Sequence, residues 1–328
     1  MVDTHAHSIK TIGSFYGMDG KKLQRYYRKK LSNYKDWQYR HSASQGLIYP
    51  ENIGPHLSLD ETCLSHGELY TILTNKAAKG KKGSIVAILK GTNSETIIPL
   101  LERIPNYLRK RVQEITLDLA GSMSLIVKKC FPHARMVIDR FHVQQLATEA
   151  LQEIRIQHRW QAIEADNEAI EESRKNKRAY NPEILSNGET LKQMLARSRY
   201  LLYKSEHNWT LEQKTRADIL FTRYPDLQRA YRLSQKLSWI YTNTTDKVYA
   251  LTRLAKWHED VAQAGFKTFN TISRTIELNY KRILNYFNNR STNASAESFN
   301  AKIKGFRAQY RGVTDVNFFL FRLSKLFA

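Results

Sequence analysis

Three acidic residues are spaced so that they could serve one reaction centre. Asp60 follows the alternating Leu57 and Leu59 of a strand pattern, Asp118 ends a later strand pattern, and Glu297 belongs to a helical pattern near the C-terminus. Aspartate is depleted in strands, so two of them at strand ends need an explanation. If the two strands are neighbours, their carboxylates emerge together and raise each other's pKa unless a cation lies between them.

Magnesium is the cation that suits such a pair, because it binds hard oxygen ligands and phosphate oxygens together. A third carboxylate is needed to hold a second ion for in-line attack at phosphorus, and Glu297 is the candidate. We therefore predict a site for two Mg²⁺ ions, with Mn²⁺ as a substitute, on Asp60, Asp118 and Glu297. The alternative for each aspartate taken alone is a turn or cap residue.

Three nearby residues compete for a role at this site. Asp139 ends the strand pattern VIDRFH and could replace Asp118 as a ligand. His142 either caps a following helix, packs under the sheet or takes part in catalysis. Glu61 adjoins Asp60, but alternation along a strand places it on the opposite face, so we do not expect it to share the same metal.

The elements that must position these residues begin at His56. Three short strand patterns with tight connections predict an antiparallel meander. A helix broken by Pro105, a fourth strand, a helix stopped by Pro132 and a fifth strand follow. The order β-β-β-α-β-α-β, closed by a final helix, predicts a mixed α/β sheet and is also the element order of the ribonuclease H-like fold. The strand patterns are HLSLDET, LYTILTNKA, SIVAILKG, EITLDLAG and ARMVIDRFH.

After His142 the strand patterns end, and amphipathic helices fill the sequence up to the final helix. We expect a long helix over 143–173, further helices over 191–203, 211–224, 227–241 and 245–264, and another over 267–288. The predicted organisation has four parts: a basic N-terminal arm (1–55), the first part of the catalytic core (56–142), a helical insertion (143–288) and the final catalytic helix with the C-terminal segment (289–328).

The stretch Arg290–Gly312 predicts a helix with one apolar face, and Glu297 belongs to the stripe that borders this face. It is either an ordinary surface helix or a helix that presents a metal-binding Glu297 to a polyanion. We expect Gly305 to end it. The basic residues that follow Glu297, and that we expect to contact phosphates, are Lys302, Lys304, Arg307 and Arg311.

The overall charge favours a nucleic acid as the partner. The 328 residues contain 52 Lys and Arg against 31 Asp and Glu, a net charge of +21, which indicates a polyanion. No apolar run approaches the ~20 residues of a membrane-spanning helix, and the N-terminus lacks the pattern of a signal peptide. Cys63 and Cys130 are too few for a disulfide framework and fit a reducing cytosol.

The segment Lys21–Arg40 combines basic residues with aromatic ones and is predicted to be helical. Its aromatic rings either dock the segment on the main domain or stack on bases while its cations contact phosphates; both can hold. The residues predicted to contact DNA here are Lys21, Lys22, Arg25, Arg28, Lys29 and Lys30.

Four blocks of sequence resemble DDE transposases of bacterial insertion sequences, close to the ISL-three family. They are LDE at Leu59–Glu61, TLD at Thr116–Asp118, FPHARMVIDRFHV at Phe131–Val143 and TNASAESFNAKIKGFRAQYRG at Thr292–Gly312. The resemblance runs from about His56 to the C-terminus. It implies that Asp60, Asp118 and Glu297 are the acidic triad and that the helical region is inserted between the last strand and the glutamate.

The resemblance also implies an activity and partners. The enzyme is expected to cleave and join double-stranded DNA at insertion-sequence ends and target, with Mg²⁺, as a homo-oligomer in the bacterial cytoplasm near the nucleoid. Relatives often carry a zinc-binding segment and a helix-turn-helix before the first aspartate. The end-recognition domain is therefore expected to be missing, reduced to Lys21–Arg40 or supplied as a separate helix-turn-helix protein. The alternatives are a ribonuclease H-like nuclease or resolvase without strand transfer, and a non-catalytic DNA-binding protein derived from a transposase.

Overall fold

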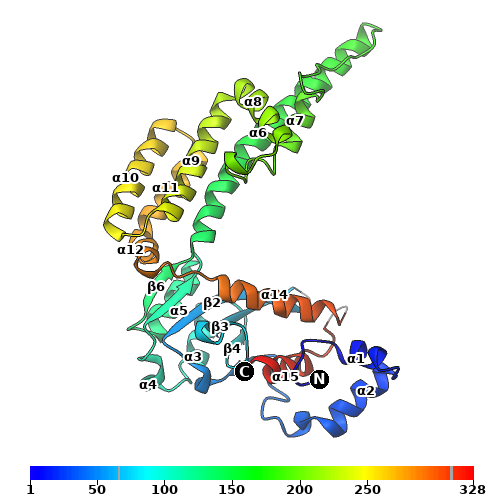
Figure 1. Cartoon of the computed structure of the whole chain (residues 1–328), viewed down its shortest axis with the longest axis vertical. Helices are drawn as coiled ribbons and strands as arrows, with labels where there is room; N and C mark the ends of the chain where they lie inside the picture. Colours follow the sequence, from blue (N-terminus) through cyan, green and yellow to red (C-terminus); the bar gives the residue numbers. More distant parts are fainter. Residues whose placement is uncertain (66, 311–312) are drawn as a thin grey trace. The chain divides into compact units, whose positions relative to one another are not determined.

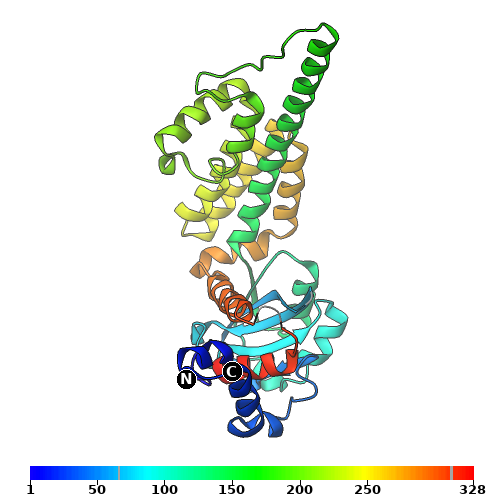
Figure 2. The ribbon, with the colours of Figure 1, turned by 90° about the vertical axis from the view of Figure 1, so that its right-hand side faces the viewer.

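The computed structural model describes residues 1–65, 67–310 and 313–328. The chain divides into two compact units (Figures 1 and 2). We name the first the α/β unit, formed by Met1–Asp139 and Ser291–Ala328, and the second the helical unit, Arg140–Arg290. Asp60, Asp118 and Glu297 all belong to the α/β unit. Arg311, one of the residues predicted to contact DNA, lies outside the described residues.

A six-stranded mixed sheet forms the centre of the α/β unit, with the strand order β1-β4-β3-β2-β5-β6. β2 pairs antiparallel with β3, β3 with β4 and β4 with β1, whereas β2 pairs parallel with β5 and β5 with β6. The predicted ribonuclease H-like order is confirmed. The strands are β1 (Gly46–Ile48), β2 (His56–Ser65), β3 (Glu68–Asn75), β4 (Ile85–Lys90), β5 (Glu114–Leu117) and β6 (Arg135–Ile138).

The edge strand β1 was not foreseen from the sequence. It has three residues and pairs only with β4, where Leu47 lies opposite Ile88. Leu47 is fully buried, so the packing of the sheet, rather than a local pattern, makes this segment a strand. A three-residue strand is too short to show the alternation on which sequence-based prediction depends.

Helices cover both faces of the sheet. On one face, α14 (Ala294–Ala308) and α15 (Val316–Phe327) contribute Phe299, Phe306 and Phe319 to a buried cluster with Ile72 of β3 and Ile88 of β4. α3 (Ser94–Leu101) contacts β4, α5 (Gly121–Cys130) contacts β5, and the two contact each other. Because their buried side chains are not part of the cluster under α14 and α15, α3 and α5 pack on the opposite face. The short α4 (Asn106–Arg109) lies between them in sequence.

The N-terminal segment forms short helices. α1 (Ile9–Phe15) and α2 (Gly20–Tyr26) contact each other, and a π-helical turn (Tyr27–Leu31) and a 3₁₀ turn (Asn33–Asp36) continue α2. Further 3₁₀ turns are Pro50–Asn52 and Lys76–Ala78. The polar composition of the first 16 residues suggests a loosely ordered start, but buried Ile9 and Ile12 give α1 an apolar face.

The helical unit is built on one long helix, α6, which contacts α7, α9 and α11. Trp257 of α10 is completely buried, and its indole N–H donates to the backbone carbonyl of Leu233 at 2.9 Å. The predicted helix over 267–288 is interrupted twice. The helices are α6 (Arg140–Lys175), α7 (Leu191–Arg197), α8 (Leu211–Arg223), α9 (Pro225–Asn243), α10 (Lys247–Ala264), α11 (Lys267–Leu278), α12 (Tyr280–Leu284) and α13 (Tyr286–Asn289), with a 3₁₀ turn at Glu206–Asn208.

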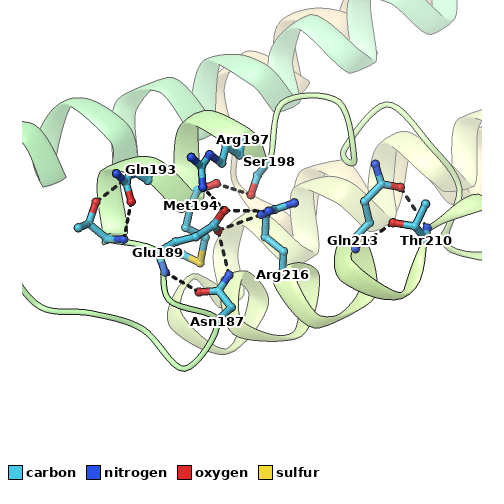
Figure 3. Close-up of polar contacts among 10 residues, drawn as sticks. Asn187, Glu189, Gln193, Met194, Arg197, Ser198, Thr210, Gln213 and Arg216 are labelled. Carbon is cyan, nitrogen blue, oxygen red and sulfur yellow. Dashed lines mark hydrogen bonds and ion pairs between the residues drawn. The ribbon is translucent and has the colours of Figure 1, made fainter.

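One ion cluster joins the loop before α7 to α8 (Figure 3). Glu189 is 4% exposed, and its carboxylate accepts hydrogen bonds from Arg216 at 2.8 and 2.9 Å, from Arg197 at 2.9 Å and from Asn187 at 2.9 Å. These donors, Arg216 first, lower the pKa of Glu189 to about 2. The carboxylate is therefore ionised and fully neutralised inside the fold.

Among the residues that the structure describes, no helix combines the length and the apolar character needed to cross a membrane.

Candidate active site

The pairing of β2 with β5 brings the two predicted aspartates to the same level of the sheet. Ser58 lies opposite Thr116 in parallel register, and Asp60 and Asp118 each come two residues later. Asp60 lies within β2, so it points to the same face as Ser58, whereas Asp118 comes directly after the last residue of β5. The Asp60 Oδ1 accepts from the backbone N–H of Glu61 at 2.8 Å, and the Asp118 Oδ1 accepts from that of Ala120 at 2.7 Å.

A third carboxylate, Glu61, interacts electrostatically with both aspartates. Burial raises the pKa of Glu61, and the negative charges of Asp118 and Asp60 raise it further. Alternation along β2 directs Glu61 away from Asp60, yet the charge of Asp118, which comes directly after β5, also raises the pKa of Glu61. The alternation of side chains along the strand was the sole reason to exclude Glu61 from the predicted metal site. The end of the neighbouring strand was the signal that it lies close to Asp118.

The helix α14 that carries Glu297 lies against β2. Glu297 is exposed in the first turn of this helix, and Asn300, one turn later, donates from Nδ2 to Oδ2 of Asp60 at 2.7 Å. Residues three apart share a helix face, so the turn that holds Glu297 is adjacent to the turn that contacts Asp60. Sequence reasoning missed Asn300, although its spacing from Glu297 was the available signal.

The expectation that Gly305 ends this helix is wrong, since α14 continues to Ala308. Ile303 and Phe306, on either side of the glycine, are both buried in the cluster with Phe319. A glycine inside a helix costs about 1 kcal/mol relative to alanine, and burying a phenylalanine contributes more than that. Tertiary packing therefore carries the helix past Gly305.

A half-buried lysine fastens the segment before α14 to the sheet. Lys76, just after β3, donates from Nζ to the hydroxyl of Thr116 on β5 at 2.6 Å and to that of Ser291. Burial lowers the pKa of Lys76, while the charges of Glu114 and Asp139 oppose that shift. Because Thr116 is two residues before Asp118, this contact links the approach to α14 with the strand that ends at Asp118.

Asp139 and His142, the other candidates, belong to different units. Asp139 comes directly after β6, one position beyond the pairing of Ile138 with Leu117, and its backbone N–H donates to the carbonyl of Leu117 at 2.9 Å. This register sets Asp139 beside Asp118, and its side chain is fully buried. His142 lies in the first turn of α6 in the helical unit.

Asp60 and Asp118 suit a magnesium ion in one specific respect. Mg²⁺ usually takes one or two carboxylates and completes its shell with water and substrate phosphate, rather than with a cage of protein ligands. The pKa of Glu61 is raised by burial first and then by the negative charges of Asp118 and Asp60, and a nearby cation would relieve the second contribution. Within residues 1–65, 67–310 and 313–328, no three His, Cys, Asp or Glu side chains are arranged as a ready-made metal site.

The basic residues of α14 divide into two groups. Lys302 donates to the carbonyl of Gly80 at 2.8 Å, and Arg307 donates to that of Cys63 at 2.9 Å, so both help to dock the helix on the sheet. Lys304 is exposed. It therefore remains the described α14 cation best placed to contact an external phosphate.

In the N-terminal arm, most aromatic side chains pack internally. Tyr27 and Tyr34 are buried against Phe318 and Phe321 of α15. Arg28 also acts within the fold, since it pairs with Asp315 at 2.8 Å and lies over the rings of Tyr34 and Phe318. The docking interpretation of Lys21–Arg40 therefore accounts for these residues.

The cations of the arm, Arg28 among them, line two open grooves that share Arg25 and Lys29. The first has a volume of about 780 Å³ and includes the exposed Tyr26, and the second has a volume of about 470 Å³. Neither is lined by an acidic residue of the predicted triad. The basic residues are Lys22, Arg25, Lys29 and Lys30 in the first groove and Lys21, Arg25, Arg28, Lys29, Lys35 and Arg40 in the second.

Comparison with known proteins identifies the family. A family model of ISL3 (ISL-three) DDE transposases, described as "Transposase", matches residues 57–323. The match covers both aspartates, the helical unit, and α14 with Glu297. A comparison with curated proteins finds no match. Because the family model spans most of the chain and the sheet has the ribonuclease H-like order, the chain belongs to the ISL3 family of transposases.

Proposed function

We propose that this protein is a catalytically active DDE transposase that cleaves DNA at insertion-sequence ends and joins the ends to a target. The main support is the parallel register of β2 and β5, which sets Asp60 level with Asp118 under a helix that carries Glu297. The family to which the chain belongs supports the same reaction class.

In this proposal Asp60 and Asp118 bind the catalytic cation, and Glu297 completes the site when DNA is present. Mg²⁺ bound there supplies positive charge that activates an attacking hydroxyl and stabilises the leaving oxygen. The backbone N–H groups of Glu61 and Ala120 hold one oxygen of each aspartate. The carboxylates are thus oriented before DNA binds, which reduces the reorganisation that the reaction requires.

The proposed DNA contacts come from the exposed cations. Lys304 on α14 and the residues of the two N-terminal grooves offer positive charge to phosphates, which positions DNA without identifying its sequence. Arg28, Lys302 and Arg307 already have partners inside the protein. We assign these three to holding the basic surface in place. Joining two ends to one target further suggests that at least two copies act together.

The test is divalent-ion-dependent end cleavage by Asp60→Asn, Asp118→Asn and Glu297→Gln. Each should abolish cleavage and strand transfer while DNA binding persists, because the phosphate contacts are made elsewhere. Asp218→Asn, on the exposed surface of α8, is the control and should remain active. Full cleavage by any of the three variants would refute the assignment of that residue.

The same assay separates the alternatives. A strand-transfer reaction with preprocessed ends gives joined products with a transposase and none with a nuclease or resolvase. A DNA-binding protein without catalytic activity would show salt-sensitive binding and no cleavage with Mg²⁺ or Mn²⁺. Either result would contradict the proposal.

A further inference from the structure

The contact between Asn300 and Asp60 joins the helix of Glu297 to the first aspartate. Asn300 is 7% exposed, and its amide donates to Oδ2 of Asp60 at 2.7 Å. The other oxygen, Oδ1, accepts from the backbone N–H of Glu61 at 2.8 Å. Asp60 therefore has a donor on each oxygen, one from its own strand and one from α14.

Two hydrogen-bond donors fix the orientation of a carboxylate without using its whole capacity to accept. An ionised carboxylate has about four lone-pair positions, so a donor on each oxygen does not by itself prevent the carboxylate from binding a cation. Carboxylates that bind metals are commonly held in this way by neighbouring groups, and loss of such a group typically lowers metal affinity or activity by 10–100-fold.

The side chain type at position 300 also matters. A lysine or arginine there would neutralise Asp60 and oppose the binding of a cation, as Arg216 neutralises Glu189 in the helical unit. An aspartate would add another negative charge beside Asp60 and Asp118. A neutral amide donor orients Asp60 without placing a charge beside it.

We propose that Asn300 is a positioning residue of the active site: it sets the orientation of Asp60 and ties it to the helix turn that carries Glu297. This inference rests on the proposed function. It assigns a role to a residue outside the acidic triad, and it explains why the α14 residue in contact with Asp60 is an amide.

The experiment measures Mn²⁺ binding to the full chain without DNA, by the paramagnetic resonance signal of the free ion. Asn300→Leu keeps a similar volume and removes the donor, and it should weaken Mn²⁺ binding by 10–100-fold. Asn300→Asp also removes the donor, but its added negative charge attracts the cation, so it should weaken Mn²⁺ binding less than Asn300→Leu does. In cleavage assays, both variants should need more Mg²⁺ for half-maximal rate while their KM for DNA changes little.

Asn293→Leu is the matched control. Asn293 begins the same helix, is fully buried, and its amide atoms have no hydrogen-bond partner within the described residues. This variant should bind Mn²⁺ like the parent chain. Equal losses in Asn293→Leu and Asn300→Leu, together with equal losses of thermal stability, would reduce Asn300 to a packing residue and overturn the inference.

The outcomes also separate this inference from the proposed function. If Asp60→Asn abolishes Mn²⁺ binding and cleavage but Asn300→Leu matches the parent in both, only the role of Asn300 is wrong. If Asp60→Asn binds Mn²⁺ and cleaves DNA normally, the proposed function itself fails.

Discussion

In the helical unit, the buried carboxylate of Glu189 is surrounded by Arg216, Arg197 and Asn187, whereas in the α/β unit Glu61 lies near the like charges of Asp118 and Asp60. The first arrangement lowers a carboxyl pKa, whereas in the second burial raises the pKa of Glu61 and the like charges raise it further. A carboxylate neutralised by arginines stabilises a fold and has no need of a further cation. Carboxylates that lie close together repel one another and destabilise the fold, and a bound cation removes that repulsion.

The physical consequence is a division of roles. The Glu189 cluster fixes the loop before α7 to α8 within the helical unit. The carboxylates of Asp60, within β2, and of Asp118, just after β5, are instead oriented by neutral donors, the backbone of Glu61 and Ala120 and the amide of Asn300. Neutral donors preserve the negative charge, which is the property that a cation-binding site requires.

The largest expected effect on stability comes from Glu189→Gln. Removing the carboxylate leaves Arg216 without its charge partner, and breaking a buried pair of this kind costs about 2–4 kcal/mol, reduced here because Arg197 is largely exposed. Urea denaturation of the full chain, followed by a probe in the helical unit, measures the change. A loss below about 0.5 kcal/mol would show that the cluster contributes little.

The difference in stability between the parent chain and Glu189→Gln should depend on pH in a defined direction. Because the pKa of Glu189 is lowered from 4.5 to about 2, its contribution is fully present above pH 4.5 and is lost as the pH falls from 4.5 through about 2. The stability gap between the parent and Glu189→Gln should shrink over that interval. Glu183→Gln is the control, since Glu183 forms an exposed pair with Arg223 at 3.4 Å and should change stability little at any pH.

An intermediate effect is expected from Lys76→Met. The substitution keeps the length of the side chain but removes both hydrogen bonds, to Thr116 and Ser291, at a cost of about 1–3 kcal/mol. Hydrogen exchange should accelerate in the first turns of α14 more than in α3, because the lost contacts hold the approach to α14. Lys81→Met, an exposed lysine of the same loop, should leave exchange in α14 unchanged. Uniform acceleration across the sheet would argue against a local clamp.

The smallest effect on stability is expected from Glu61→Gln, and this substitution should stabilise the protein rather than destabilise it. The folded state raises the pKa of Glu61 above 4.5, so the wild-type chain loses stability as the pH rises through that raised pKa. Glutamine removes the penalty and should stabilise the apo protein by about 0.2–1 kcal/mol at neutral pH, with no gain below pH 4.5. Thermal unfolding across this pH range measures it.

Glu68→Gln provides the contrast for that measurement. Glu68 pairs with Lys90 at 2.7 Å on the surface, so its substitution should be neutral or slightly destabilising. Saturating Mg²⁺ should also reduce the advantage of Glu61→Gln, because a bound cation relieves the same repulsion. An advantage that does not change with Mg²⁺ would place Glu61 outside the influence of the proposed metal site.

Much of the α/β unit follows from local sequence. Alternating Leu57 and Leu59, the β-rich runs after them and the helix-stopping Pro132 predict the main strands in their order, because each pattern spans enough residues to show its period. The spacing of Ala296, Phe299 and Ile303 likewise predicts α14. The two aspartates were recognisable because aspartate is depleted in strands, so one within or directly after a strand pattern needs an explanation.

The amino-acid sequence by itself determined the ribonuclease H-like order of elements, the position of Asp118 at a strand end and the basic charge of the chain. The strand-end position expected for Asp60 is wrong, because β2 continues from Asp60 to Ser65. Only the tertiary structure decided the edge strand β1, the continuation of α14 past Gly305, and the internal use of Arg28, Lys302 and Arg307. It also decided that Asn300 donates a hydrogen bond to Asp60 and that the charge of Asp118 raises the pKa of Glu61. These features depend on contacts between residues far apart in the chain, whose energies outweigh local preference and leave no periodic trace in the sequence.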